Sequence, residues 1–212
     1  RLERWLRGGE DRVLARVLES LWTEPAPKVF AWLLEAGHLP EEADLEVLQA
    51  DLRPAHPEHV LAHVEAMAPL TTQGEVLAAA CSIDAPETRE VDDVLTLTRE
   101  GDEWRVDIDI ADVAAWVEAG DPVDREAARR ASTAYLPTGP ITMLPERLGC
   151  ELASLHTDAP RPALRATVWL DPDGLPLRHR LERVSILVQK RLDYETADAL
   201  LAVVRSFRDP CV

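Results

Sequence analysis

The sequence predicts an α+β protein with two parts: a helical N-terminal domain over residues 1–74 and a mixed, largely antiparallel domain over residues 75–212. Before residue 75, apolar side chains recur every three or four positions, which is the period of an amphipathic helix. After it, short apolar runs alternate with glycine, proline and aspartate, which is typical of strands and turns. The stretch Pro-Leu-Thr-Thr-Gln-Gly at 69–74 separates the two patterns and indicates a linker.

Five short helices are expected in the first domain. The helical period runs through residues 2–22 but is interrupted at Gly8 and Gly9, so we expect two helices there. Three more are expected over residues 25–36, 41–52 and 57–67. A compact domain of this kind fits a helix-turn-helix or winged-helix type, and its acidity fits a protein-contact scaffold equally well. The sequence leaves these alternatives open.

The second domain is expected to alternate strands with helices. Strands are expected over residues 76–83, 94–98, 104–110, 164–170 and 175–188, with glycine-containing turns inside the two hairpins. Helices are expected over residues 112–119, 124–135, 145–155 and 193–207. Asp112 is of the residue type that caps a helix N-terminus, so we expect it to cap the first of these helices.

Four acids gather at the end of the first expected strand: Asp84, Glu90, Asp92 and Asp93. Bringing such carboxylates together costs free energy, through repulsion and desolvation, unless a cation lies among them. Mg²⁺ suits them because it prefers oxygen ligands and takes only a few carboxylates beside water and phosphate. Two such ions about 3.5–4 Å apart support cleavage of a phosphodiester. A solvated loop is the alternative. An EF-hand fits poorly, because the loop lacks the Asp-x-Asp-x-Asp-Gly order and has no glycine for the sharp turn.

This segment resembles the start of the catalytic domain of the ribonuclease II and ribonuclease R family. The resemblance covers roughly residues 78–205. Further blocks follow in the family's order: Ile108-Asp-Ile-Ala-Asp-Val113, Val123-Asp-Arg-Glu-Ala-Ala-Arg-Arg130, Ser132-Thr-Ala-Tyr-Leu-Pro137, Met143-Leu-Pro-Glu-Arg-Leu148, Leu152-Ala-Ser-Leu155, Arg161-Pro-Ala-Leu164 and Arg191-Leu-Asp-Tyr-Glu195. One acidic motif is a weak signal, whereas several ordered blocks are a specific one.

The resemblance implies a Mg²⁺-dependent, processive 3′-to-5′ exoribonuclease that releases nucleoside 5′-monophosphates from single-stranded RNA. It implies that the four acids hold metal and hydrolytic water, and that Tyr135 stacks on an RNA base. The family's catalytic domain continues past the matched blocks, so we expect the chain to be the front of a longer enzyme.

Two positions depart from the family pattern. Glu90 stands where the family usually has aspartate, and Asp109 stands where it usually has histidine. Glu90 favours an alternative function, in which the protein keeps the fold with a degraded site and serves as an RNA-binding or scaffold protein. Arg129 and Arg130 suit either phosphate contacts or a solvated helix face.

Composition narrows the class further. The 212 residues carry a net charge of −16, which counts against a basic nucleic-acid module, although bound metal offsets acids at a nuclease site. The three cysteines are widely spaced and predict no disulfide framework, so we expect a reducing cytoplasm and no structural zinc. We expect a monomer with RNA as its partner, and neither DNA nor a membrane, because no apolar run reaches about 18 residues.

Overall fold

The computed structural model describes residues 1–41, 43–50, 52–70, 75–136 and 139–208, which form two compact units. The helical unit comprises Arg1–Pro57 and Glu126–Met143; the barrel unit comprises Glu58–Arg125 and Leu144–Val212. These units cut across the boundary that we placed between residues 74 and 75. The proposal that residues 1–74 fold as a domain of their own stays a prediction.

Four of the five expected N-terminal helices form the helical unit: α1 (Leu2–Leu6), α2 (Arg12–Leu21), α3 (Pro25–Glu35) and α4 (Leu45–Gln49). Their core consists of leucine and valine side chains: Leu6, Leu18, Val29, Leu33, Leu39 and Leu48. Aspartates fix two starts, because Asp11 accepts a hydrogen bond from the Leu14 amide and Asp44 accepts from Glu46 and Val47. The helix expected over residues 41–52 is therefore shorter; residues 42 and 51 lie outside the described part of the chain.

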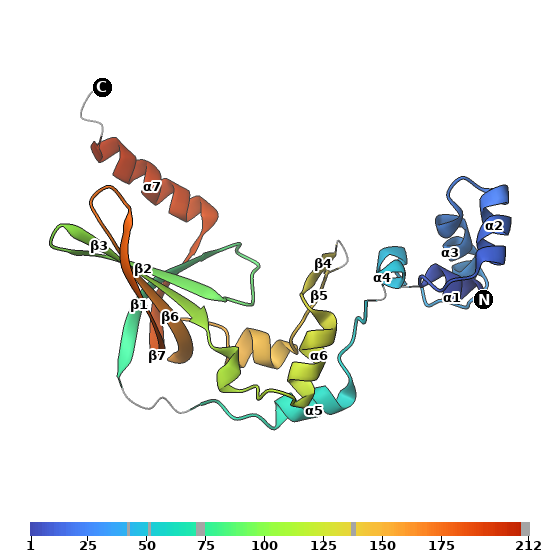
Figure 1. The fold of residues 1–212 in the computed structure, drawn as a ribbon, viewed down its shortest axis with the longest axis horizontal. Helices are drawn as coiled ribbons and strands as arrows, with labels where there is room; N and C mark the ends of the chain where they lie inside the picture. The colour runs from blue at the N-terminus through green and yellow to red at the C-terminus, as the bar shows by residue number, and fades with distance from the viewer. Residues whose placement is uncertain (42, 51, 71–74, 137–138, 209–212) are drawn as a thin grey trace. The chain divides into compact units, whose positions relative to one another are not determined.

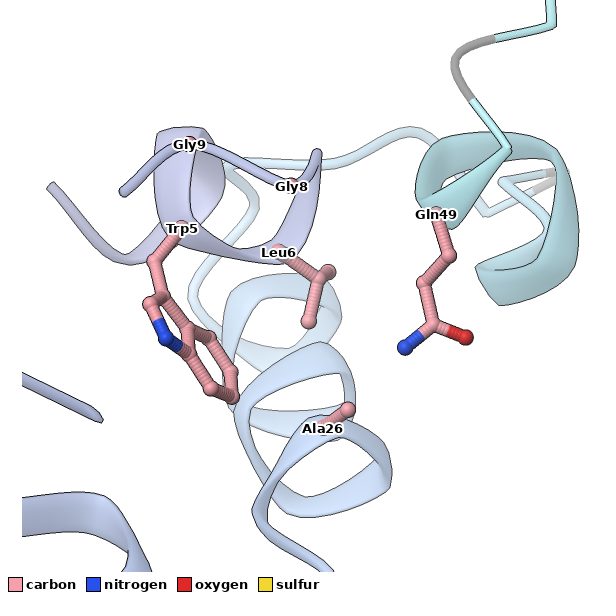
Figure 2. Close-up of a pocket in the computed structure, with 6 residues that line it drawn as sticks. All are labelled: Trp5, Leu6, Gly8, Gly9, Ala26 and Gln49. Carbon is pink, nitrogen blue, oxygen red and sulfur yellow. The ribbon is translucent and has the colours of Figure 1, made fainter. Parts of the chain in front are cut away.

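A cavity of about 310 Å³ opens beside α1 in the helical unit. Figure 2 shows Trp5 and Leu6 of α1, Ala26 of α3 and Gln49 of α4 around it. Its lining includes no titratable side chain among the described residues, so it brings no acid, base or nucleophile together. The described residues of 1–70 contain no strand, which removes the winged-helix alternative.

The second segment of the helical unit, Glu126–Met143, begins within α6 (Pro122–Arg130). This helix ends five residues before the end expected at residue 135. Ala131 has a left-handed φ of 62°, so the helix stops there and β4 (Ala134–Leu136) pairs with β5 (Gly139–Ile141) instead. Buried Arg130 donates to the Glu126 carboxylate and to the carbonyls of Arg53, Ala55 and Thr142. Arg130 is thus a structural tie rather than a phosphate contact.

The barrel unit is built on a closed five-stranded barrel (Figure 1). Its strands are β1 (Val76–Asp84), β2 (Asp93–Glu100), β3 (Glu103–Ala111), β6 (Arg161–Leu170) and β7 (Pro176–Asp193). Neighbours run antiparallel around the order β1-β2-β3-β6-β7, and a parallel β1–β7 pairing closes the barrel. The helix α7 (Tyr194–Arg208) follows β7 directly. The mixed, largely antiparallel sheet was expected; its closure was not.

The interior of the barrel is apolar at one level and charged at the next. Ala79, Val94, Ala163, Ile186 and Val188 form an apolar cluster with Val91 and Leu155. Below it, Arg165 on β6 donates to both carboxylate oxygens of Asp109 on β3, at 2.7 and 2.8 Å. Thr167 donates to Asp107 in the next row, at 2.7 Å. Asp109, the departure from the family's histidine, is therefore fully buried and paired with a buried arginine.

Helix α5 (Glu58–Glu65) packs against the short π-helical segment η2 (Arg147–Leu152) in the barrel unit. Val60, Val64, Leu148 and Leu152 form the centre of this contact. The helix expected over residues 112–119 is only the 3₁₀ turn η1 (Val113–Ala115). The cap expected at Asp112 was wrong, because its carboxylate pairs with Arg183 at 3.1 Å rather than with the turn's amides. No helix among the described residues is both long and apolar enough to cross a membrane.

Candidate active site

The four acids lie where β1 ends and β2 begins. Asp84 is the last residue of β1 and Asp93 the first of β2, and the segment from Asp84 to Asp93, here called the acidic loop, joins the two strands. The loop contains one turn, in which the Thr88 amide donates to the Ala85 carbonyl at 3.0 Å. The structure thus brings all four predicted acids to one end of one barrel.

Hydrogen bonds to the backbone fix the second half of this loop. Val91 is fully buried; its amide donates to Ser154 Oγ at 2.8 Å and its carbonyl accepts from the Leu155 amide at 2.9 Å. The carbonyl of Asp92 accepts from the Ala111 amide on β3, also at 2.9 Å. Because these bonds use only backbone groups of the loop, the carboxylates themselves stay available.

The electrostatics of the loop are those of acids without counter-ions. Desolvation raises the pKa of Glu90, and the charge of Asp92 raises it further, while Arg89 partly opposes both. Desolvation also raises the pKa of Asp92, followed by repulsion from Asp93 and Asp84. Residue 92 nevertheless remains exposed, so solvent screens this repulsion. Among the described residues, no ion pair involves any of the four acids.

Two carboxylate oxygens in the site are buried without a hydrogen-bond partner: Oδ2 of Asp84 and Oε1 of Glu90. Such atoms cost free energy unless a donor or a cation meets them. Glu90 Oε1 lies directly over Gly149 of η2, so close that a Cβ at residue 149 would come within 2.5 Å of it. The longer side chain at position 90 is therefore accommodated by a glycine.

The residues present fit a Mg²⁺ ion by donor chemistry, since all are carboxylates and two have unpartnered buried oxygens. They do not form a closed cage: within the described part of the chain, no three acidic, imidazole or thiol groups lie together as a ligand set. Mg²⁺ does not need one, because it keeps several waters and commonly takes one or two carboxylates plus phosphate.

Tyr135 belongs to the other unit, so the structure groups the four acids without it. It lies on β4 opposite Pro140 and is 80% exposed, so it is not a core side chain. An exposed aromatic ring is free to stack on a base.

Sequence reasoning gave no role to two residues that contact the acidic loop. Ser154 and Arg191 both fell within blocks that carried the family resemblance, yet neither is a carboxylate and neither stands in a catalytic motif. Arg191 on β7 donates to the carbonyls of Ala85 and Thr88. No local sequence pattern signals a contact of this kind, because any residue supplies the carbonyl.

Comparison with known proteins finds relatives among ribonucleases. A family model described as the RNB domain matches residues 76–210. The chloroplastic/mitochondrial ribonuclease II of Arabidopsis thaliana is 29% identical over 211 residues, covering 94% of this chain and 26% of the relative. The chain thus spans about a quarter of that relative's length.

Solved structures share the fold. Ribonuclease R of Mycoplasma genitalium, in complex with ribose-methylated single-stranded RNA, superposes with a TM-score of 0.68 at 21% identity, over 74% of this chain and 26% of that one. Yeast Ssd1, described as a pseudonuclease, superposes with a TM-score of 0.55 at 21% identity, over 63% of this chain and 18% of that one. One architecture therefore occurs in a ribonuclease and in a pseudonuclease.

Proposed function

The chain belongs to the RNB-domain family, and from this premise we propose that it supplies the metal-binding part of a processive, Mg²⁺-dependent 3′-to-5′ exoribonuclease. Its substrate is single-stranded RNA and its products are nucleoside 5′-monophosphates. The observation that carries the proposal is the acidic loop, where Asp84 and Glu90 hold buried, unpartnered carboxylate oxygens beside Asp92 and Asp93. Acids kept without counter-ions in a folded protein favour a cation-binding role.

In this proposal Asp84, Glu90, Asp92 and Asp93 hold the metal, which when bound activates water and neutralises charge on the leaving oxygen. The chain's own contribution is orientation. The buried Val91 fixes the backbone between Glu90 and Asp92, so their carboxylates point from a rigid segment. Fixed carboxylates need little reorganisation when charge develops at the scissile phosphate.

The reach of Glu90 suits an outer position. Its carboxylate lies over Gly149, and burial there raises its pKa. A carboxylate so placed can accept a hydrogen bond from a metal-bound water and orient that water. Asp92 and Asp93 are both exposed, so a metal ion and a substrate phosphate can reach their carboxylates from solvent.

Two further features complete the proposal. The cytoplasm is its compartment and a monomer its state; the described cysteines, Cys81 and Cys150, are both free thiols. RNA, rather than DNA or a membrane, is the partner.

A non-catalytic RNA-binding or scaffold role is the second candidate. Glu90 in place of the family's aspartate favours it, as does the likeness in fold to a pseudonuclease. The two functions differ in one assay: single-stranded RNA labelled at the 3′ or the 5′ end, incubated with the full-length protein in Mg²⁺ or EDTA. Mononucleotides that appear only with Mg²⁺ support the exonuclease; binding without hydrolysis supports the scaffold; internal cuts contradict both.

Tyr135 offers a separate test of the RNA-binding surface. Tyr135→Ala should weaken binding of a short single-stranded RNA by roughly 1–3 kcal/mol, because one base loses its stacking partner. Its melting temperature should stay unchanged, since the ring is exposed. Unchanged affinity for the short RNA would end the stacking role.

A further inference from the structure

The acidic loop carries several negative charges, and no positively charged side chain of the loop pairs with them among the described residues. The four acids lie within ten positions here, and among the described residues none of them has an ion-pair partner, so their like charges repel one another. Before a cation arrives, this repulsion favours an open loop. Something else must hold the loop in the form that receives the ion.

Arg191 contacts the first half of the loop. It lies on β7 opposite Ser82, in the parallel pairing that closes the barrel. Its guanidinium Nη2 donates to the carbonyl of Ala85, at 3.4 Å, and to that of Thr88. Ala85 directly follows the metal-site residue Asp84, and Thr88 ends the turn.

Ser154 contacts the second half. It is 1% exposed, and its hydroxyl accepts from the Val91 amide at 2.8 Å and donates to the Arg89 carbonyl at 3.3 Å. These two backbone groups flank Glu90 on either side. A single buried hydroxyl therefore sets the position of that residue.

Both contacts leave the carboxylates alone. An arginine placed against an acid of the site would compete with the metal, but Arg191 donates to carbonyls and Arg89 pairs with Glu146. Two arginines thus lie near the site without neutralising the carboxylates that attract the metal.

We propose that Arg191 and Ser154, together the loop clamp, are positioning residues that hold the acidic loop in its metal-receiving form and so set its affinity for divalent cations. This rests on the proposed metal-binding function. The clamp acts through backbone groups of Ala85, Thr88, Arg89 and Val91, and touches neither metal nor RNA.

Whether Arg191→Met strengthens or weakens divalent-cation binding decides if Arg191 acts by holding the loop or only by its charge. Removing a cation near four acids should strengthen binding of a divalent ion if charge alone mattered. Loss of the clamp should weaken it, because the acids then spread. Residues that orient metal ligands typically contribute 10–100-fold to affinity, and we expect about tenfold here because Arg191 is exposed.

The experiment titrates Mn²⁺ into the metal-free protein, with paramagnetic resonance reporting free ion, for wild type, Arg191→Met, Arg191→Lys, Ser154→Ala and Lys190→Met. Lys190 is the matched control, since it is an exposed cation next to Arg191 on β7. We expect about tenfold weaker binding for Arg191→Met and Ser154→Ala. Lys190→Met should bind as wild type or slightly more tightly, and Arg191→Lys should fall between.

Amide hydrogen exchange on the same proteins, without metal, reads the clamp independently. The amides of Thr88 and Val91 should lose protection in Arg191→Met and Ser154→Ala respectively, while amides of β3 and β6 keep theirs. Unchanged loop protection overturns the clamp, as does tighter Mn²⁺ binding in Arg191→Met. If wild type binds no Mn²⁺, the proposed metal function fails, and exchange still decides whether the clamp exists.

Discussion

Two groups of acids in the barrel unit are treated in opposite ways by the fold. Asp109, in the barrel interior, is fully buried and accepts two hydrogen bonds from Arg165. Asp84 and Glu90, at the barrel's end, have buried oxygens that no described group meets. The interior acid therefore stabilises structure through its ion pair, whereas the charges of the loop acids are not neutralised by any described residue. A carboxylate's partner, more than its burial, distinguishes a structural acid from a candidate ligand.

The largest expected effect tests the interior group. Arg165→Met leaves the buried Asp109 carboxylate without its partner, which should lower the free energy of unfolding by about 3–5 kcal/mol. Arg178→Met is the matched control, because it removes contacts near the surface, an ion pair with Glu103 and a cation–π contact with Trp169, and should cost about 1 kcal/mol. Denaturant melts measure both. A loss for Arg165→Met no larger than the control's would remove the contrast between the two groups of acids.

The next effect concerns the loop. Asp93→Asn should reduce RNA hydrolysis by more than about 10²-fold while leaving the melting temperature and RNA affinity unchanged, because the amide keeps shape but loses charge. Single-turnover assays in Mg²⁺ on the full-length protein measure this loss. Near-normal turnover would move Asp93 from the metal site to the class of solvated surface acids.

Position 90 sharpens the comparison within the loop. Glu90→Asp should keep turnover within about tenfold of wild type, or roughly 1.4 kcal/mol in barrier height, since charge remains and only reach changes. Glu90→Gln should cost considerably more. Turnover rates of the two variants decide; equal and negligible effects would place Glu90 outside the site.

The smallest effect follows from the raised pKa of Asp92. A carboxyl with a raised folded-state pKa binds its proton more readily in the folded chain, so it destabilises the fold as pH rises through and above that pKa. Asp92→Asn should therefore stabilise the metal-free protein at pH 7, by less than about 1 kcal/mol because the residue is exposed. The gain should vanish below the ordinary aspartate pKa of about 3.9.

Asp193→Asn is the control with the opposite sign. Hydrogen bonds from the side chain and amide of Thr196 lower the pKa of Asp193, so this acid stabilises the fold above its ordinary pKa and ceases to do so as pH falls. Denaturant melts in EDTA at pH 7 and near pH 3.5 measure both variants. Destabilisation by Asp92→Asn at pH 7 would contradict the repulsion assigned to the loop.

Local sequence signals predicted most elements but not how they close. The five N-terminal helices and the barrel strands were confirmed, because apolar period and turn residues act over a few positions. The parallel pairing of β1 with β7 joins distant segments, and no local pattern announces it. The helix expected through Tyr135 was wrong because Ala131 adopts a left-handed φ, which alanine does not signal.

At the candidate site, the sequence predicted that the acids lie close together, but it did not predict which residues hold their loop. The acids were recognisable because carboxylates at close spacing are costly without a reason. Asp112 was assigned a cap from its type alone, and tertiary pairing with Arg183 overrode that local role. The roles of Ser154 and Arg191 were not predicted, because both residues bind backbone groups. Every residue has such groups, so the sequence does not mark which of them will be bound.

The parallel pairing that closes the barrel also determines when, during translation, the site can assemble. The acids at residues 84–93 leave the ribosome well before Arg191, whose contact with Ala85 spans 106 residues. At about 5–20 residues per second, that interval is roughly 5–20 seconds of translation. During it the nascent loop has neither β7 beside it nor the barrel around it, and such distant pairings are slow to form. Assembly of the carboxylate centre is therefore a late event, and the growing chain carries its acids unassembled while still close to the RNA being translated.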